Sequence, residues 1–120
     1  MLNHGTVIIF VRDMDRAVKF YTEILGHKLE YYEKDIWASL DAGDGLKIGL
    51  HPGTDSAHAP GTNGGTQISF SVTKPIGDVV QTLRTRGAKI TGEVREDGPI
   101  KLAFVADPDG NELCLFEMSH

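Results

Sequence analysis

The chain repeats one pattern of residues about half its length apart. Four positions of the first half recur 61 positions later: Val11, Val18, Gly26 and Leu29, then Val72, Val79, Gly87 and Ile90. Further on, the Asp-Gly pair at 44–45 recurs at 109–110, at a spacing of 65. Because 120 residues suit one domain and are too few for two ordinary ones, we expect the repeat to divide a single domain of residues 1–120. The space between two such copies is a natural place for a ligand.

Each copy reads as a strand, a helix and three further strands. Asp13 is expected to cap the first helix, which ends at Gly26, and Thr73 to cap the second, which has Pro75 at an early position and ends at Gly87. A stretch rich in Gly, Pro, Ser and Thr, residues 52–65, reads as a linker between modules 1–51 and 66–120. The fold class is therefore α+β, built from two β-α-β-β-β modules. The expected strands are 6–11, 28–33, 37–42 and 46–51, then 67–72, 89–94, 100–106 and 112–117.

Composition excludes several classes of partner. The formal net charge is −5 and no Lys/Arg cluster offsets it, so we expect no binding to nucleic acid. No run approaches the roughly 20 apolar residues that a membrane-spanning helix needs, so we expect no membrane association. A short apolar run at 7–11 without a cleavage site argues against export, and the single cysteine, Cys114, fits a reducing cytoplasm.

Alternation along the strands predicts two different sheet faces. Ile9 and Val11 would pack on a helix, so Thr6, Ile8 and Phe10 would lie on the other face of the sheet. Across the strands this second face is rich in polar side chains. We interpret that face as the lining of a cavity, with a solvated sheet surface as the alternative.

Two motifs give the chain a family resemblance. They are the run from Val11 to Ala17, followed by Phe20-Tyr21 and Leu25-Gly26, and the run from Phe104 through Asp107-Pro108-Asp109-Gly110-Asn111. In this order the chain resembles the vicinal oxygen chelate superfamily, which includes glyoxalase I, bleomycin resistance proteins, fosfomycin resistance proteins and extradiol dioxygenases. The resemblance implies a cup-shaped cavity formed by the two modules, and a homodimer.

The resemblance also implies where metal-using members would hold their ion. Counted from the motifs, the four ligand positions fall at Thr6, Gly49, Gln67 and Cys114. Glycine has no ligand atom, and threonine and glutamine are weak donors, so we expect no metal cofactor. A shifted set of His4, His51 and Glu112, two residues away along each strand, is the alternative and would take Zn, Ni, Mn or Fe.

These observations favour binding of a small organic molecule without the usual metal. His51 and Glu112 are the candidate catalytic residues, each with a solvated strand end as its alternative. Cys114 is a candidate nucleophile or a small buried apolar residue, Trp37 a stacking surface or a core residue, and His27 is expected to be exposed. The rival function is a metal-dependent lyase or isomerase like glyoxalase I, or an extradiol-type dioxygenase. The residues expected to bind the ligand are Thr6, Trp37, Ser39, Gly49, His51, Gln67, Ser69, Glu112 and Cys114.

Overall fold

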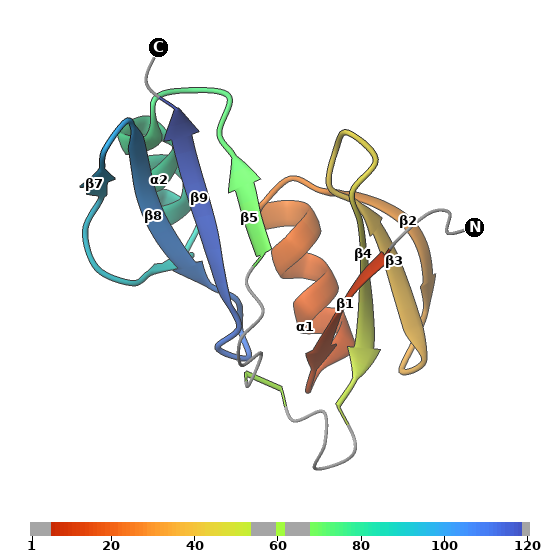
Figure 1. Cartoon of the computed structure of the whole chain (residues 1–120). Helices are drawn as coiled ribbons and strands as arrows, with labels where there is room; N and C mark the ends of the chain where they lie inside the picture. Colours follow the sequence, from red (N-terminus) through yellow and green to blue (C-terminus); the bar gives the residue numbers. More distant parts are fainter. Residues whose placement is uncertain (1–5, 54–59, 62–67, 119–120) are drawn as a thin grey trace. The chain divides into compact units, whose positions relative to one another are not determined.

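The computed structural model describes residues 6–53, 60–61 and 68–118 (Figure 1). The chain divides into two compact units, 1–62 and 63–120, and the boundary falls within the segment read as a linker. His4, Gln67 and most of that linker lie outside the described residues. The cup expected between the modules depends on how they are placed relative to each other and stays a prediction.

Unit 1 is a four-stranded sheet with one helix. Its elements are β1 (Thr6–Val11), α1 (Met14–Lys19), the π-helical turn η1 (Phe20–Ile24), β2 (Lys28–Glu33), β3 (Trp37–Asp41) and β4 (Lys47–Pro52). Sheet A has the order β1-β4-β3-β2, with β1 parallel to β4 and the other pairs antiparallel. The predicted order of a strand, a helix and three strands is confirmed.

The first helix begins as predicted and changes its hydrogen bonding halfway. The Asp13 side chain accepts a hydrogen bond of 3.1 Å from the Arg16 backbone N–H, so the predicted cap is confirmed. From Phe20 the helix becomes π-helical, and the Leu25 N–H reaches back five residues to the Phe20 carbonyl. The wider turn accompanies burial of two consecutive aromatic residues, Phe20 and Tyr21. Gly26 then ends the helix with a φ of +84°.

Unit 2 repeats the order of a strand, a helix and further strands, with one additional short strand, β7. They are β5 (Ile68–Ser71), α2 (Ile76–Thr85), β6 (Lys89–Ile90), β7 (Arg95–Asp97), β8 (Ile100–Ala106) and β9 (Glu112–Met118). Sheet B has the order β5-β9-β8-β6, and β7 also pairs with β8. The parallel pair β5 and β9 corresponds to β1 and β4 of unit 1, so the sequence repeat is a repeat of topology.

Two local predictions for unit 2 are wrong. The strand expected over 89–94 stops at Ile90, because Gly92 has a φ of +89° that breaks the extended chain, and a separate strand, β7, follows. Thr73 does not cap α2. Pro75 lies just before the helix, outside it, and the Ile76 N–H is satisfied by the carboxylate of Glu117 in β9, at 2.6 Å.

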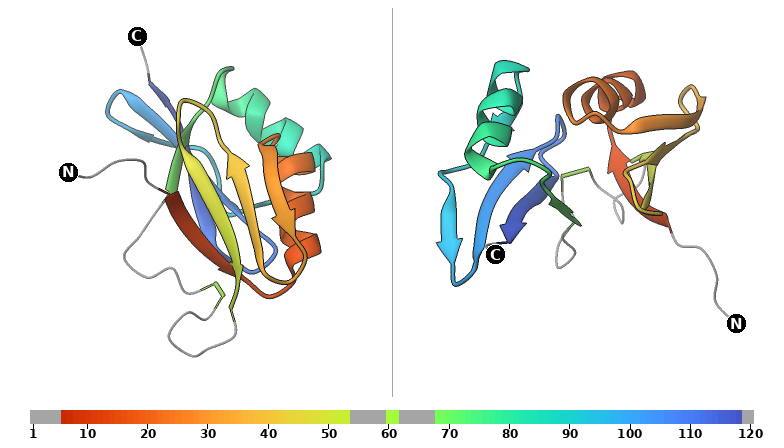
Figure 2. Two further views of the ribbon diagram at one scale, coloured as in Figure 1. Left: turned by 90° about the vertical axis from the view of Figure 1, so that its right-hand side faces the viewer. Right: turned by 90° about the horizontal axis from the view of Figure 1, so that it is seen from above.

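Each helix covers one face of its own sheet (Figure 2). In unit 1 the core joins α1 to the strands through Val11, Met14, Tyr21, Leu40 and Leu50, all buried. In unit 2 the buried stripe of α2 packs on the alternate residues of β8 and β9; it comprises Ile76, Val80 and Leu83. One face of each sheet therefore remains without a helix. In the described part of the chain no helix is long and apolar enough to cross a membrane.

Candidate functional site

The face of sheet A that α1 leaves uncovered carries aromatic and apolar side chains. Burial alternates along β1 as predicted, with Ile9 buried and Ile8 49% exposed. In β4 the alternation is interrupted, because Gly49 is buried between Ile48 and Leu50, and His51 is exposed. We call this surface the open face of sheet A. It is formed by Thr6, Ile8, Phe10, Tyr31, Glu33, Trp37, Ser39, Gly49 and His51.

Strand register brings the predicted residues of unit 1 together on this face. Gly49 lies between Ile8 of β1 and Ser39 of β3, and Ser39 is paired in turn with Tyr31 of β2. Thr6 stands on β1 opposite Lys47, one step from that row, and is exposed. Four predicted residues, Trp37, Ser39, Gly49 and His51, are thus neighbours on two adjacent strands.

Trp37 lies over Gly49 and fills the space a side chain there would need. A Cβ built on Gly49 would stand 2.0 Å from Cη2 of the indole and 2.7 Å from Cζ2 and Cζ3. Real Cβ atoms essentially never come within 3.0 Å of such a neighbour, so position 49 admits only glycine while Trp37 keeps this orientation. The position that the family resemblance assigns to a metal ligand is therefore covered by an aromatic ring.

His51 stands between two other rings of the open face. Its imidazole lies edge to face with Phe10, at a centroid distance of 5.5 Å, and with Trp37, at 6.5 Å. Nδ1 is 2.8 Å from the carbonyl oxygen of Pro52. Because a carbonyl only accepts hydrogen bonds, Nδ1 carries the proton and donates it. In the neutral ring, Nε2, on the far side of the ring from the backbone, then keeps the lone pair.

Two polar groups of this face, Tyr31 and Lys47, which stands opposite Thr6, are each paired with a carboxylate. The Lys47 ammonium lies 2.9 Å from a carboxylate oxygen of Glu30 and 3.6 Å from one of Asp41. The hydrogen bond to Glu30 is the main cause that raises the pKa of Lys47, so this amine stays a charged ion-pair partner. At the other end Tyr31 donates a 2.8 Å hydrogen bond to Glu33, which raises the pKa of the Tyr31 phenol.

The predicted site residues of unit 2 lie along β5 and β9, and sheet B brings two of them together. Ser69 is paired with Cys114. The Cys114 side chain is only 4% exposed, and its Sγ is 3.7 Å from the Leu115 carbonyl, which fits the interpretation as a small buried residue rather than a nucleophile. Glu112 is exposed at the start of β9 and accepts a 3.2 Å hydrogen bond from the Thr91 hydroxyl.

The three of the family's metal positions that the structure describes offer poor metal ligands. Gly49 has no ligand atom and is covered by Trp37, Cys114 is buried, and Thr6 offers a single neutral hydroxyl. Of the shifted alternative, His51 and Glu112 belong to different units and His4 lies outside the described residues. Among residues 6–53, 60–61 and 68–118, no three His, Cys, Asp or Glu side chains gather so that they could hold an ion.

The sequence did not predict several residues of the open face of sheet A, nor one contact on sheet B. Phe10 was placed on this face but not counted in the site, and Tyr31 and Glu33 were overlooked. The irregularity between Leu29 and Tyr31 in β2 breaks simple alternation, so only the register with β3 identifies them. On sheet B, the Arg95 guanidinium lies 5.1 Å from the centroid of the Phe104 ring, and no sequence pattern signals this contact.

The second family motif is structural. The Asp107 carboxylate accepts hydrogen bonds of 2.9 Å from the Asp109 and Asn111 backbone N–H groups and from the Asn111 side-chain amide. These bonds close the turn between β8 and β9 in a buried setting. The motif therefore identifies the fold and supplies no site residue.

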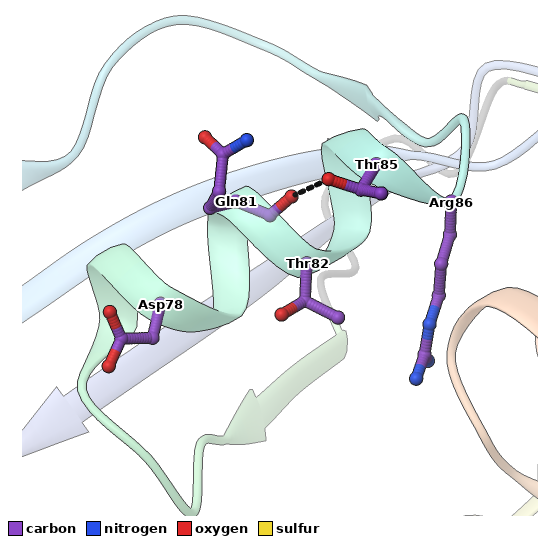
Figure 3. A pocket seen from close by; sticks show the side chains of 5 residues that line it. All are labelled: Asp78, Gln81, Thr82, Thr85 and Arg86. Atoms are coloured by element: carbon purple, nitrogen blue, oxygen red, sulfur yellow. Dashed lines mark hydrogen bonds between the residues drawn. The ribbon is translucent and has the colours of Figure 1, made fainter.

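Unit 2 also has a shallow polar groove of about 390 Å³ along α2 (Figure 3). It is lined by Asp78, Gln81, Thr82, Thr85 and Arg86. The Asp78 carboxylate and the Arg86 guanidinium stand at opposite ends of this groove (Figure 3). The Thr85 hydroxyl donates a 3.0 Å hydrogen bond to the Gln81 carbonyl. A second hollow, of about 410 Å³, lies where β5 leads into α2, beside Lys74, Glu117 and Met118. Neither hollow is lined by a residue that the sequence predicts to bind the ligand.

Comparison with known proteins relates the whole fold to one family. The pattern of the Glyoxalase/Bleomycin resistance protein/Dioxygenase superfamily matches residues 2–115. A lactoylglutathione lyase of Arabidopsis thaliana is 32% identical over 122 residues, which cover 87% of this chain and 40% of that protein. A lactoylglutathione lyase of Haemophilus influenzae is 30% identical over 122 residues, covering 89% of this chain and 86% of the relative. The chain thus spans well under half of the plant protein's length.

Solved structures agree on the fold. TnmS3, an antibiotic binding protein from a Streptomyces species, superposes with a TM-score of 0.80 at 22% identity, over 99% of this chain and 98% of that one. A superfamily member from Sphaerobacter thermophilus gives a TM-score of 0.79 at 22% identity, over 98% of each chain. With a family pattern over nearly its full length and relatives at about 30% identity, the chain belongs to the glyoxalase/bleomycin resistance protein/dioxygenase superfamily.

Proposed function

We propose that the protein binds a small organic molecule on the open face of sheet A without the metal ion that enzymes of this superfamily use. The observation that carries the proposal is the indole of Trp37 over Gly49. An aromatic ring at the position of a metal ligand changes the chemistry of the site from coordination to stacking and apolar contact. The antibiotic binding protein TnmS3, which has the same fold, supports a binding role.

The other features of the face suit such a ligand. Ile8 and Tyr31 are 49% and 52% exposed, so a ligand lying across them and Trp37 would remove apolar surface from water. Burial of each 100 Å² of such surface contributes about 2.5 kcal/mol before the costs of binding. Phe10 and His51 add aromatic edges, and the Lys47 ammonium is already paired with the carboxylates of Glu30 and Asp41.

The second candidate is a metal-dependent lyase, and the relatives named lactoylglutathione lyase favour it. It requires ligands other than Gly49, since no side chain fits there beside Trp37. The two candidates differ in their need for a metal, which makes them separable by experiment.

Trp37 is the only tryptophan of the chain, so its fluorescence reports on this face alone. Full-length protein treated with a chelator and then dialysed is titrated with a panel of planar and aliphatic organic molecules. Saturable quenching by planar compounds that is unchanged by added Zn, Ni, Mn or Fe supports the proposal. Calorimetry on Trp37→Leu is expected to show at least tenfold weaker binding, with Val94→Ala, an exposed residue of unit 2, as the control. Binding or turnover that appears only with a metal would contradict it.

A further inference from the structure

We infer that the molecule bound on the open face of sheet A is a planar aromatic compound with a hydroxyl or amino hydrogen-bond donor at its rim, received by Nε2 of His51. The inference rests on the proposed function and adds the chemical class of the ligand. It follows from the hydrogen bond that fixes the His51 tautomer.

With the proton on Nδ1, Nε2 is the hydrogen-bond acceptor of the His51 ring, and this ring lies between two aromatic side chains. Nδ1 donates to the Pro52 carbonyl at 2.8 Å, so the neutral ring keeps its lone pair on Nε2. Among the described residues no hydrogen bond to Nε2 is formed, and the ring's aromatic neighbours are Phe10 and Trp37. In the free protein water can satisfy this nitrogen, because the side chain is exposed.

A ligand stacked on Trp37 would displace that water. The indole and imidazole centroids are 6.5 Å apart and their planes differ by 67°, so a ring stacked on Trp37 has its rim beside the imidazole. A rim without a donor would bury Nε2 unpaired, and an unsatisfied buried acceptor weakens binding. A rim O–H or N–H would replace the water and retain the hydrogen bond.

Three probes of matched shape test this requirement. Naphthol carries the donor, its methyl ether keeps the oxygen without the donor, and naphthalene has neither. In calorimetric titrations of the full chain at about pH 8.5, we expect naphthol to bind about three- to tenfold more tightly than its methyl ether. The ratio should fall to about one in His51→Phe, which keeps an aromatic ring but has no acceptor, and should persist in Val94→Ala.

The outcomes distinguish failure of the inferred hydrogen bond to Nε2 from failure of the proposed ligand binding on the open face of sheet A. If the three probes bind equally to the unaltered protein and quench Trp37, or if His51→Phe keeps the preference, the inference is wrong and the proposed function stands. If no probe binds or quenches Trp37, the proposed function on this face fails as well. Nitrogen NMR of the unaltered protein provides a measurement independent of any variant's folding. A proton on Nδ1 and none on Nε2 supports the inference, and the reverse tautomer overturns it.

Discussion

The carboxylate of Glu117, near the end of β9, accepts a 2.6 Å hydrogen bond from the backbone N–H of Ile76, the first residue of α2. The two residues are 41 positions apart, so the start of the helix depends on the last strand in the sequence. A carboxylate here satisfies one of the free N–H groups of the helix and also interacts favourably with the helix dipole.

Glu117→Ala is therefore expected to destabilise the protein by about 1–2 kcal/mol, the usual cost of losing a helix cap. Glu117→Gln keeps an acceptor without the charge and should lose about half of that. Urea unfolding measures both. Glu112→Gln is the control, because that side chain is exposed on the same strand and does not touch a helix end. Equal stability of Glu117→Ala and the unaltered protein would show that the cap contributes nothing.

The sequence predicted the structural features that depend on residues close together in the chain, and it did not predict those that depend on which strands pair. Alternation placed Ile8, Phe10 and His51 on the open face correctly, because a period of two needs only the strand itself. The Asp13 cap lies three residues from its partner and was likewise predictable. The Glu117 cap and the position of Trp37 over Gly49 were not, because each depends on which strands become neighbours and in what register.

The contact between Trp37 and Gly49 predicts strong coupling between the two positions. Gly49→Ala should cost about 1–3 kcal/mol, because the new methyl group must push the indole aside. In a Trp37→Leu background the same change should cost much less, so the double-mutant cycle should give a coupling of at least about 1 kcal/mol. The Gly49→Ala protein should also shift its tryptophan emission. Additive effects in the cycle, with unchanged emission, would contradict the contact.

Asp107 is predicted to be the most sensitive residue of the second motif. Its carboxylate accepts three hydrogen bonds in a buried turn, so Asp107→Ala should destabilise the protein by about 3 kcal/mol or more. Asp35→Asn is the matched control, since it also removes one negative charge, is exposed, and has a φ of +62° that asparagine adopts readily. Thermal unfolding compares the two variants. If Asp107→Ala lost no more thermal stability than Asp35→Asn, the hydrogen bonds of Asp107 would not stabilise the fold.

His27 provides a pH-dependent prediction. The sequence led us to expect an exposed residue, but the ring is half-buried after the π-helical turn and stacks on Tyr21 at 6.1 Å. Burial is the main cause that lowers the pKa of His27, with Asp41 acting weakly in the opposite direction. Because the native state holds the neutral ring, His27 contributes no penalty above the unfolded pKa of about 6.5. As the pH falls below that value, the unfolded chain binds a proton first and stability decreases, until the pH passes the lowered pKa of the folded state.

His27→Phe keeps the stacked ring and cannot titrate. The difference in unfolding free energy between the unaltered protein and this variant, measured in urea from neutral to acidic pH, should therefore fall on acidification. A difference that stays constant or rises would show that burial of His27 does not lower its pKa.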